Sequence, residues 1–166
     1  MTREAFGQRI IDMQASLFRV AYGILLNHSD CEDAVQESIV KAWQRLDRLR
    51  DETLLRTWVT RILINECYNH MRKNRRIVYM HTVPEGAIPP PGADAELHDA
   101  IASLSEPLRL PVVLHYMEGY RVDEIAGLLK CPTGTVKSRL RKARAILAEL
   151  LADEERKVGV SCKGAI

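Results

Sequence analysis

A proline-rich segment near the middle of the chain constrains the fold more than any other feature. Residues 77–94 contain Pro84, Gly86, Pro89, Pro90, Pro91 and Gly92. Proline lacks a backbone N–H and fixes φ, so such a run neither continues a helix nor joins the middle of a sheet. The segment therefore predicts a linker that divides the 166-residue chain into two separately patterned parts, and this length accommodates two small domains.

The parts on either side of this linker have the periodicity of helices. In residues 30–46 and again in residues 54–71, apolar side chains recur every three or four positions, which is the spacing of one helix face. The alternation of polar and apolar residues that strands show is absent at useful length. We therefore expect an all-α protein with two small helical domains, residues 1–76 and 95–155, and a flexible tail at 156–166.

Composition narrows the class of protein. The chain is 46% hydrophobic and 28% charged, as expected of a sequence that folds around a core. No run approaches the roughly 18 apolar residues that span a bilayer, and the N-terminus does not resemble a signal peptide. We expect a cytoplasmic protein that does not insert into membranes.

The cysteines and histidines do not have the spacing of metal ligands. We therefore expect no metal and no cofactor, and we interpret the cysteines mainly as reduced structural thiols. A redox role for a pair of them stays open at this point. The four cysteines are Cys31, Cys67, Cys131 and Cys162.

Charge is segregated along the chain, although the net charge is only +2. Residues 30–37 contain four acids and no base, and residues 56–76 contain six bases and one acid. Residues 77–106 then contain five acids and no Lys or Arg, whereas residues 130–144 contain six bases and no acid. Two basic segments separated by an acidic linker predict two contacts with nucleic acid.

The most specific motif is VDEIAGLLKCPTGTVKSRLRKARAIL, at residues 122–147. Pro132 ends a first helix, and a second helix is expected from Thr133. A stripe covering about 60° of the second helix is apolar and leaves Ser, Lys and Arg on the opposite side. This arrangement suits a helix that reads the major groove, although a solvated basic helix in an ordinary bundle is the alternative. The stripe consists of Val136, Leu140, Ala143 and Leu147.

Residues 106–144, EPLRLPVVLHYMEGYRVDEIAGLLKCPTGTVKSRLRKAR, resemble the region-four helix-turn-helix of the sigma-70 family. The resemblance implies binding to the minus-thirty-five promoter element and to the flap of the polymerase β subunit. It assigns recognition to Lys137, Ser138 and Arg141, with Lys142 on the same side. Phosphate contacts are assigned to Thr133, Thr135, Arg139 and Arg144.

Two positions depart from the pattern of that family. Arg121 stands where Ser or Thr often caps the first helix, and Asp123 partly compensates through the helix dipole. Lys130 or Cys131 replaces a glycine that is common in the turn. We therefore expect slight strain in the turn.

The segment DCEDAVQESIVKAWQRLDRLRD, at residues 30–51, resembles the polymerase-binding helix of sigma region two. Asp30, Asp33 and Glu37 fall within about 60° of each other on a helical wheel, opposite an apolar stripe. Charge alone favours the alternative of a merely solvated face. The resemblance implies that the helix docks on the coiled coil of the β′ clamp through Asp30, Asp33, Gln36, Glu37 and Lys41.

The next segment, LLRTWVTRILINECYNHMRKNRR at residues 54–76, matches the part of region two that melts the minus-ten element. Bases and aromatic residues together suit single-stranded DNA, although core packing is the better interpretation of Trp58. The resemblance implies capture of a flipped base by a loop at residues 51–55. It assigns DNA contacts to Arg56, Arg61, Asn65, Asn69, Arg72, Lys73, Arg75 and Arg76.

These resemblances imply a transcription initiation factor of the extracytoplasmic-function (ECF) type, which binds core RNA polymerase and reads promoter DNA as duplex and as melted strand. In this group only a short linker separates regions two and four, and an anti-sigma factor commonly holds the protein inactive. A stand-alone helix-turn-helix regulator is the alternative function. An enzyme is disfavoured because the sequence contains no HExxH motif, Gly-rich phosphate loop or paired-carboxylate metal motif.

Overall fold

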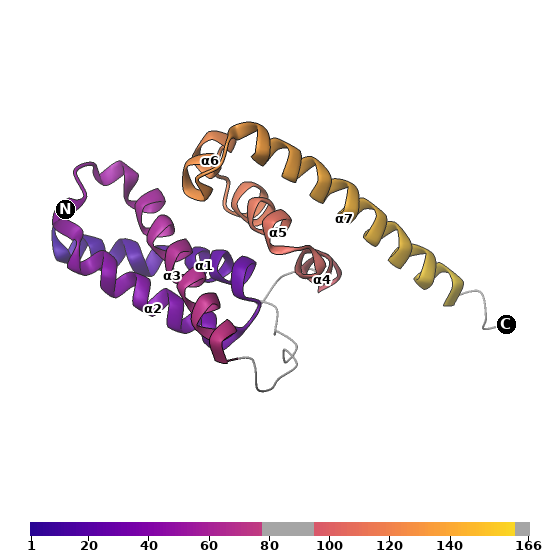
Figure 1. Cartoon of the computed structure of the whole chain (residues 1–166), viewed down its shortest axis with the longest axis horizontal. Helices are drawn as coiled ribbons and strands as arrows, with labels where there is room; N and C mark the ends of the chain where they lie inside the picture. Colours follow the sequence, from indigo (N-terminus) through magenta and orange to yellow (C-terminus); the bar gives the residue numbers. More distant parts are fainter. Residues whose placement is uncertain (78–94, 162–166) are drawn as a thin grey trace.

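The structure, a computed structural model, describes the backbone of residues 1–77 and 95–161 and the side chains of residues 1–74 and 96–152. Within those ranges the chain forms helices and no strand, which confirms the predicted all-α fold with two helical parts (Figure 1). The predicted linker lies outside the described residues, apart from Ile77 at the end of a helix.

The N-terminal module opens with two antiparallel helices, α1 (Arg3–Leu25) and α2 (His28–Gln44). The hydroxyl of Thr2 accepts the N–H of Ala5 at 3.2 Å and so caps α1. The side-chain oxygen of Asn27 caps α2 in the same way, since it accepts the N–H of Asp30 at 2.9 Å. Between the helices, Leu26 adopts the left-handed conformation with φ 53° and reverses the chain.

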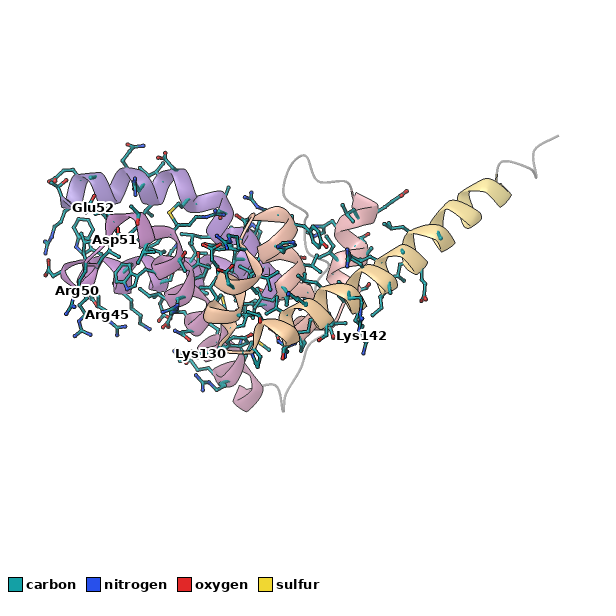
Figure 2. The ribbon with its side chains drawn as sticks, turned by 90° about the horizontal axis from the view of Figure 1, so that it is seen from above. Arg45, Arg50, Asp51, Glu52, Lys130 and Lys142 are labelled. Atoms are coloured by element: carbon teal, nitrogen blue, oxygen red, sulfur yellow. The ribbon has the colours of Figure 1, made fainter. Side chains whose placement is uncertain are left out.

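The module is completed by two 3₁₀ turns, η1 (Leu46–Arg48) and η2 (Glu52–Leu54), and by α3 (Leu55–Ile77). Helix α3 packs against both α1 and α2. Leu63, on α3, is fully buried in this three-helix core. Figure 2 shows Asp51 and Glu52 in the loop before α3, at the end of the molecule opposite the C-terminal module.

The C-terminal module contains the predicted helix-turn-helix. Glu124 accepts the N–H of Arg121 at 2.8 Å, which is the half of a capping box that the third helical residue supplies. Lys130 has φ 53°, which places the expected turn strain at this residue. The elements are α4 (Ala95–Ser103), α5 (Glu106–Val112), the π-helical turn η3 (Val113–Met117), α6 (Val122–Leu129) and α7 (Thr133–Ser161).

Helix α7 extends beyond the boundary expected from the sequence. We expected the helical domain to end at residue 155 and a tail to follow, but α7 continues to Ser161. Residues 152–158, ADEERKV, contain no Gly or Pro and consist mostly of helix formers, so local propensity supports the extension. Residues 162–166 lie outside the described part of the chain.

The two modules share one continuous hydrophobic core. Helix α1 contacts α5 and η3 of the C-terminal module. A Cβ atom at Gly23 would lie 3.2 Å from the Val113 side chain, so only glycine allows this close approach without a shift. The backbone oxygen of Gly23 accepts a hydrogen bond from Nε of the buried Arg109 at 2.8 Å. The sequence predicted two modules but not that they pack together.

Candidate nucleic-acid interface

The predicted recognition helix has the two-sided character that its sequence implied. Val136, Leu140 and Ala143 are buried, whereas Lys137, Ser138, Arg141 and Lys142 are exposed. Figure 2 shows Lys142 on the outer side of α7. A shallow groove here is lined by Leu108, Ser138, Arg139, Arg141, Lys142 and Ala145. Hydroxyl and guanidinium donors at an open helix face are suited to base edges and phosphates.

The four residues expected to contact phosphate do not all share this open face. Thr133 and Arg144 are exposed, while Thr135 and Arg139 are half-buried. Arg139 lines a second hollow together with Tyr68 of the N-terminal module and Glu106. The structure therefore places Arg139 at the junction of the modules.

Part of the predicted minus-ten face of α3 borders the C-terminal module, although Arg56, Asn65 and Arg72 themselves remain exposed. Nη2 of Arg56 donates to the backbone oxygen of Glu118 and lies 3.4 Å from its carboxylate. The Arg56 guanidinium carbon also lies 4.5 Å from the centre of the Tyr120 ring. Asn65 and Arg72 line a groove whose other wall includes Leu128, Leu129 and Lys130. Arg56 is therefore bound by the C-terminal module, whereas Asn65 and Arg72 are exposed in a groove that the same module borders.

The remaining minus-ten residues are distributed around α3. Arg61 approaches Gly127 of α6, and Lys73 is exposed. Asn69 donates weakly to Glu66 at 3.4 Å and accepts a hydrogen bond from Arg72. The side chains of Arg75 and Arg76 lie outside the described residues.

The loop expected to capture a base is internally ordered. Oδ1 of Asp51 accepts the hydroxyl and the N–H of Thr53 at 2.6 and 2.9 Å, and these bonds hold the pKa of Asp51 below its ordinary value. Leu54 is 55% exposed, whereas Leu55 is buried. Trp58 is half-buried and packs against the core, in agreement with the interpretation of this residue as a core residue.

The predicted polymerase-binding residues form one face of α2 along its border with α3. Asp33, Gln36 and Glu37 are exposed, Asp30 and Lys41 are half-buried, and all except Asp30 line one open groove. Asp30 accepts a hydrogen bond from Asn74 at 3.1 Å, and Glu37 lies 3.5 Å from Nε2 of His70.

Lys41 anchors this face to α3 through an ion pair with the buried Glu66, at 2.5 Å. Burial works against the charged form of Glu66, but hydrogen bonds from Lys41 and Asn69 outweigh it and lower the pKa of this carboxyl. The three most exposed polar residues of the face, Asp33, Gln36 and Glu37, are consequently the ones available to a partner.

The described cysteines occupy packed positions. Cys31 and Cys67 are buried, and burial raises the pKa of Cys31 to about 12 and that of Cys67 as well. Thiols in such surroundings are poor nucleophiles. Within the described ranges, no group of His, Cys, Asp and Glu is arranged to hold a metal ion, and no helix is long and apolar enough to cross a membrane.

Two residues that join the modules, Glu118 and Tyr120, were not predicted from the sequence. They belong to the stretch MEGY, at residues 117–120, between the helices of the C-terminal module. In the structure Glu118 binds α1 and α3, and the Tyr120 hydroxyl lies 2.9 Å from Oγ1 of Thr60 on α3. No local periodicity could have indicated a partner some sixty residues away in sequence.

The fold and these faces define a two-module helical protein that carries a helix-turn-helix. Residues 10–77 match the family model for sigma-70 region 2, and residues 94–147 match that for sigma-70 region 4. The chain therefore belongs to the sigma-70 family of RNA polymerase sigma factors, and its relatives place it in the ECF group.

Two curated relatives illustrate this membership. The ECF RNA polymerase sigma factor SigM of Mycobacterium tuberculosis is 32% identical over 156 residues, covering 90% of this chain and 78% of that protein. The RNA polymerase sigma-H factor of Pseudomonas aeruginosa is 27% identical over 168 residues, covering 90% and 87%.

Two solved structures have a similar fold. The sigma factor RpoE of Bartonella quintana, in complex with the anti-sigma factor NepR, superposes with a TM-score of 0.81 at 31% identity and covers 90% of this chain and 98% of that one. CnrH in complex with the cytosolic domain of CnrY gives 0.66 at 25% identity, covering 92% and 90%.

Proposed function

We propose that this protein is a promoter-directing transcription initiation factor that binds core RNA polymerase and reads the minus-ten and minus-thirty-five elements. It acts on DNA in the cytoplasm as an initiation factor and not as an enzyme. The observation that carries the proposal is the combination, in one chain, of an open helix-turn-helix and a separate acidic helix face, α2. A DNA-binding regulator alone would need only the first of these.

The helix-turn-helix supplies duplex recognition in this proposal. Helix α7 enters the major groove, where Lys137, Ser138 and Arg141 meet base edges and Thr133 and Arg144 meet phosphates. Arg141 is the strongest candidate for base discrimination, because its exposed guanidinium presents a planar set of donors that matches the acceptors of guanine.

The N-terminal module supplies polymerase binding and promoter melting. Asp33, Gln36 and Glu37 of α2 face outward and meet the coiled coil of the β′ clamp. Asn65 and Arg72 of α3 meet the melted strand, with the loop at residues 51–55 beside them. The exposed acids carry the first contact, since charge complementarity raises association rates and orients the partners.

Control by an anti-sigma factor is the second part of the proposal. Both solved relatives described above are complexes, one with the anti-sigma factor NepR and the other with the cytosolic domain of CnrY. Because this chain shares their fold over nine-tenths of its length, a protein that covers the same modules would keep it from polymerase.

Run-off transcription with purified core polymerase on a promoter library tests the function. We expect the wild-type chain to direct initiation from a subset of promoters, and Asp33→Lys to weaken polymerase binding at least tenfold while the helical signal in circular dichroism stays unchanged. Glu149→Lys, a charge reversal at an exposed site on α7, is the control and should bind polymerase normally.

Two results would contradict the proposal. The first is that core polymerase with the chain added produces no promoter-specific transcript above the level of the core enzyme alone. The second is tight binding of promoter duplex by the free chain together with unchanged polymerase affinity of Asp33→Lys, which would indicate a stand-alone regulator. Addition of an anti-sigma factor recovered by pull-down from the native host tests the control step separately.

A further inference from the structure

Glu118 is the most heavily engaged carboxylate at the junction of the two modules. Its side chain is only 2% exposed, although it belongs to the turn between η3 and α6. It accepts hydrogen bonds from the hydroxyl of Ser16 and from Nε of Arg19, the latter at 2.6 Å. Nη2 of Arg56 lies 3.4 Å from the same carboxylate. One carboxylate of the C-terminal module thus binds two helices of the N-terminal module.

The local backbone is shaped to direct Glu118 at these partners. Helix α5 contains Pro111, which has no N–H for the helical ladder, and the chain then widens into the π-helical turn η3. The N–H of Glu118 closes this turn on the oxygen of Val113 at 3.0 Å. Gly119 follows with φ 70°, a conformation that glycine adopts without strain, and the chain reverses into α6.

Tyr120 extends the same contact along α3. Its hydroxyl lies 2.9 Å from Oγ1 of the buried Thr60, and its ring stacks under the Arg56 guanidinium at 4.5 Å. Further along, the Tyr68 hydroxyl donates to Glu106 at 2.7 Å. These contacts lie on one side of α3, at Arg56, Thr60 and Tyr68, so the C-terminal module touches that helix at three points along its length.

A carboxylate that accepts two guanidinium groups and a hydroxyl offers them what a DNA phosphate would offer. Phosphate and carboxylate both present paired anionic oxygens to arginine. The resemblance to region two assigns Arg56 a contact with the minus-ten strand. A DNA phosphate at that contact would compete with Glu118 for the same donor.

We propose that Glu118 is an autoinhibitory latch: together with Ser16, Arg19 and Arg56 it occupies the place of a DNA phosphate and holds α3 closed against the C-terminal module. The part that concerns DNA rests on the proposed function, while closure itself does not. The latch opens when polymerase binds the two modules apart, since each module must then reach a separate promoter element. A free chain in the closed state must open before it binds single-stranded DNA, and opening costs free energy. Its apparent affinity for the DNA is therefore the intrinsic affinity multiplied by the fraction of open molecules.

Two variants of the full chain test the latch from opposite sides. Glu118→Gln keeps the size of the side chain and removes its charge, and Arg19→Gln removes a partner that has no assigned role in DNA binding. Glu149→Gln is the matched control on the exposed end of α7. Small-angle X-ray scattering of each free protein reports closure. Fluorescence anisotropy with a labelled single-stranded minus-ten oligonucleotide reports access to α3.

We expect both latch variants to have a larger radius of gyration than the wild type and the control, and to bind the oligonucleotide roughly tenfold more tightly. Saturating core polymerase should remove the difference in run-off transcription. If Glu118→Gln fails to fold by circular dichroism, Arg19→Gln decides the question. Unchanged scattering and unchanged oligonucleotide affinity in the folded variants would overturn the latch, as would an extended wild-type chain. If the variants expand but the wild-type chain never directs transcription, the proposed function is refuted while the latch is supported.

Discussion

Helices α3 and α7 each carry a basic face expected to bind DNA. The face of α3 contacts another part of the chain, whereas within the described residues the face of α7 does not. On α7, Lys137, Arg141 and Lys142 point into open surroundings. On α3, Arg56 is bound by Glu118 of the other module, and Asn65 lines a groove closed on one side by α6. The two segments contain the same number of bases. Charge therefore predicts the same role for both faces, but packing of the rest of the chain makes their surroundings different.

The largest expected effect comes from the buried side of α3. Leu63→Ala should lower the free energy of unfolding by about 2–5 kcal/mol, because it leaves a cavity in a fully buried site. Urea unfolding followed by circular dichroism measures this change. Leu54→Ala, at a position 55% exposed, is the control and should change stability by less than about 0.5 kcal/mol.

Urea unfolding also tests whether the C-terminal module packs against α3. Because the two modules share one core, we expect a single cooperative transition in the wild-type chain. Two separate transitions, with Leu63→Ala shifting only the first, would mean that the modules do not pack together and that both basic faces are equally open.

The next effect concerns the open face of α7. Arg141→Ala should cost about 1–3 kcal/mol at one position of the minus-thirty-five element, because a bidentate contact to a base edge is lost. Transcription by the assembled holoenzyme on a set of single-base promoter variants measures it. An equal loss on every variant would assign Arg141 to the phosphate and remove base reading from this face.

A smaller effect is expected on the covered face, and it depends on the state of the chain. Asn65→Ala should reduce binding of a minus-ten single strand about tenfold in the holoenzyme, as expected for a lost hydrogen bond to a base. The free chain should show a smaller loss, because the C-terminal module forms one wall of the groove in which the exposed Asn65 lies. An equal loss in both states would show that the C-terminal module does not obstruct α3.

The smallest effect separates two arginines of the same helix. Arg144→Ala should weaken duplex binding on all sequences alike and reduce the salt dependence by about one counterion, since an exposed phosphate contact is lost. Arg139→Ala, at the half-buried position beside Tyr68 and Glu106, should leave that slope unchanged in the free chain. A titration of affinity against salt concentration measures both, and identical slopes would place Arg139 on the open face.

The sequence by itself determined the helices, the turn and the character of the exposed surfaces. Three residues of the apolar stripe, Val136, Leu140 and Ala143, are buried as their spacing required, and the fourth, Leu147, is half-buried. The second helix begins directly after Pro132. The acids of α2 lie on a side away from the core for the same reason. These features depend on residues within one or two helical turns, where periodicity and proline chemistry act directly.

Only the tertiary structure decided which exposed surface meets another part of the chain. Glu118 and Arg19 are 99 residues apart, and Gly23 meets Arg109 across 86 residues. Neither pair belongs to a periodic pattern, and a charged residue in a turn is ordinarily solvated. Their partnership depends on how α1, α3 and α5 pack around the shared core, and this packing is set by the fit of many side chains at once, which no local segment of the sequence encodes.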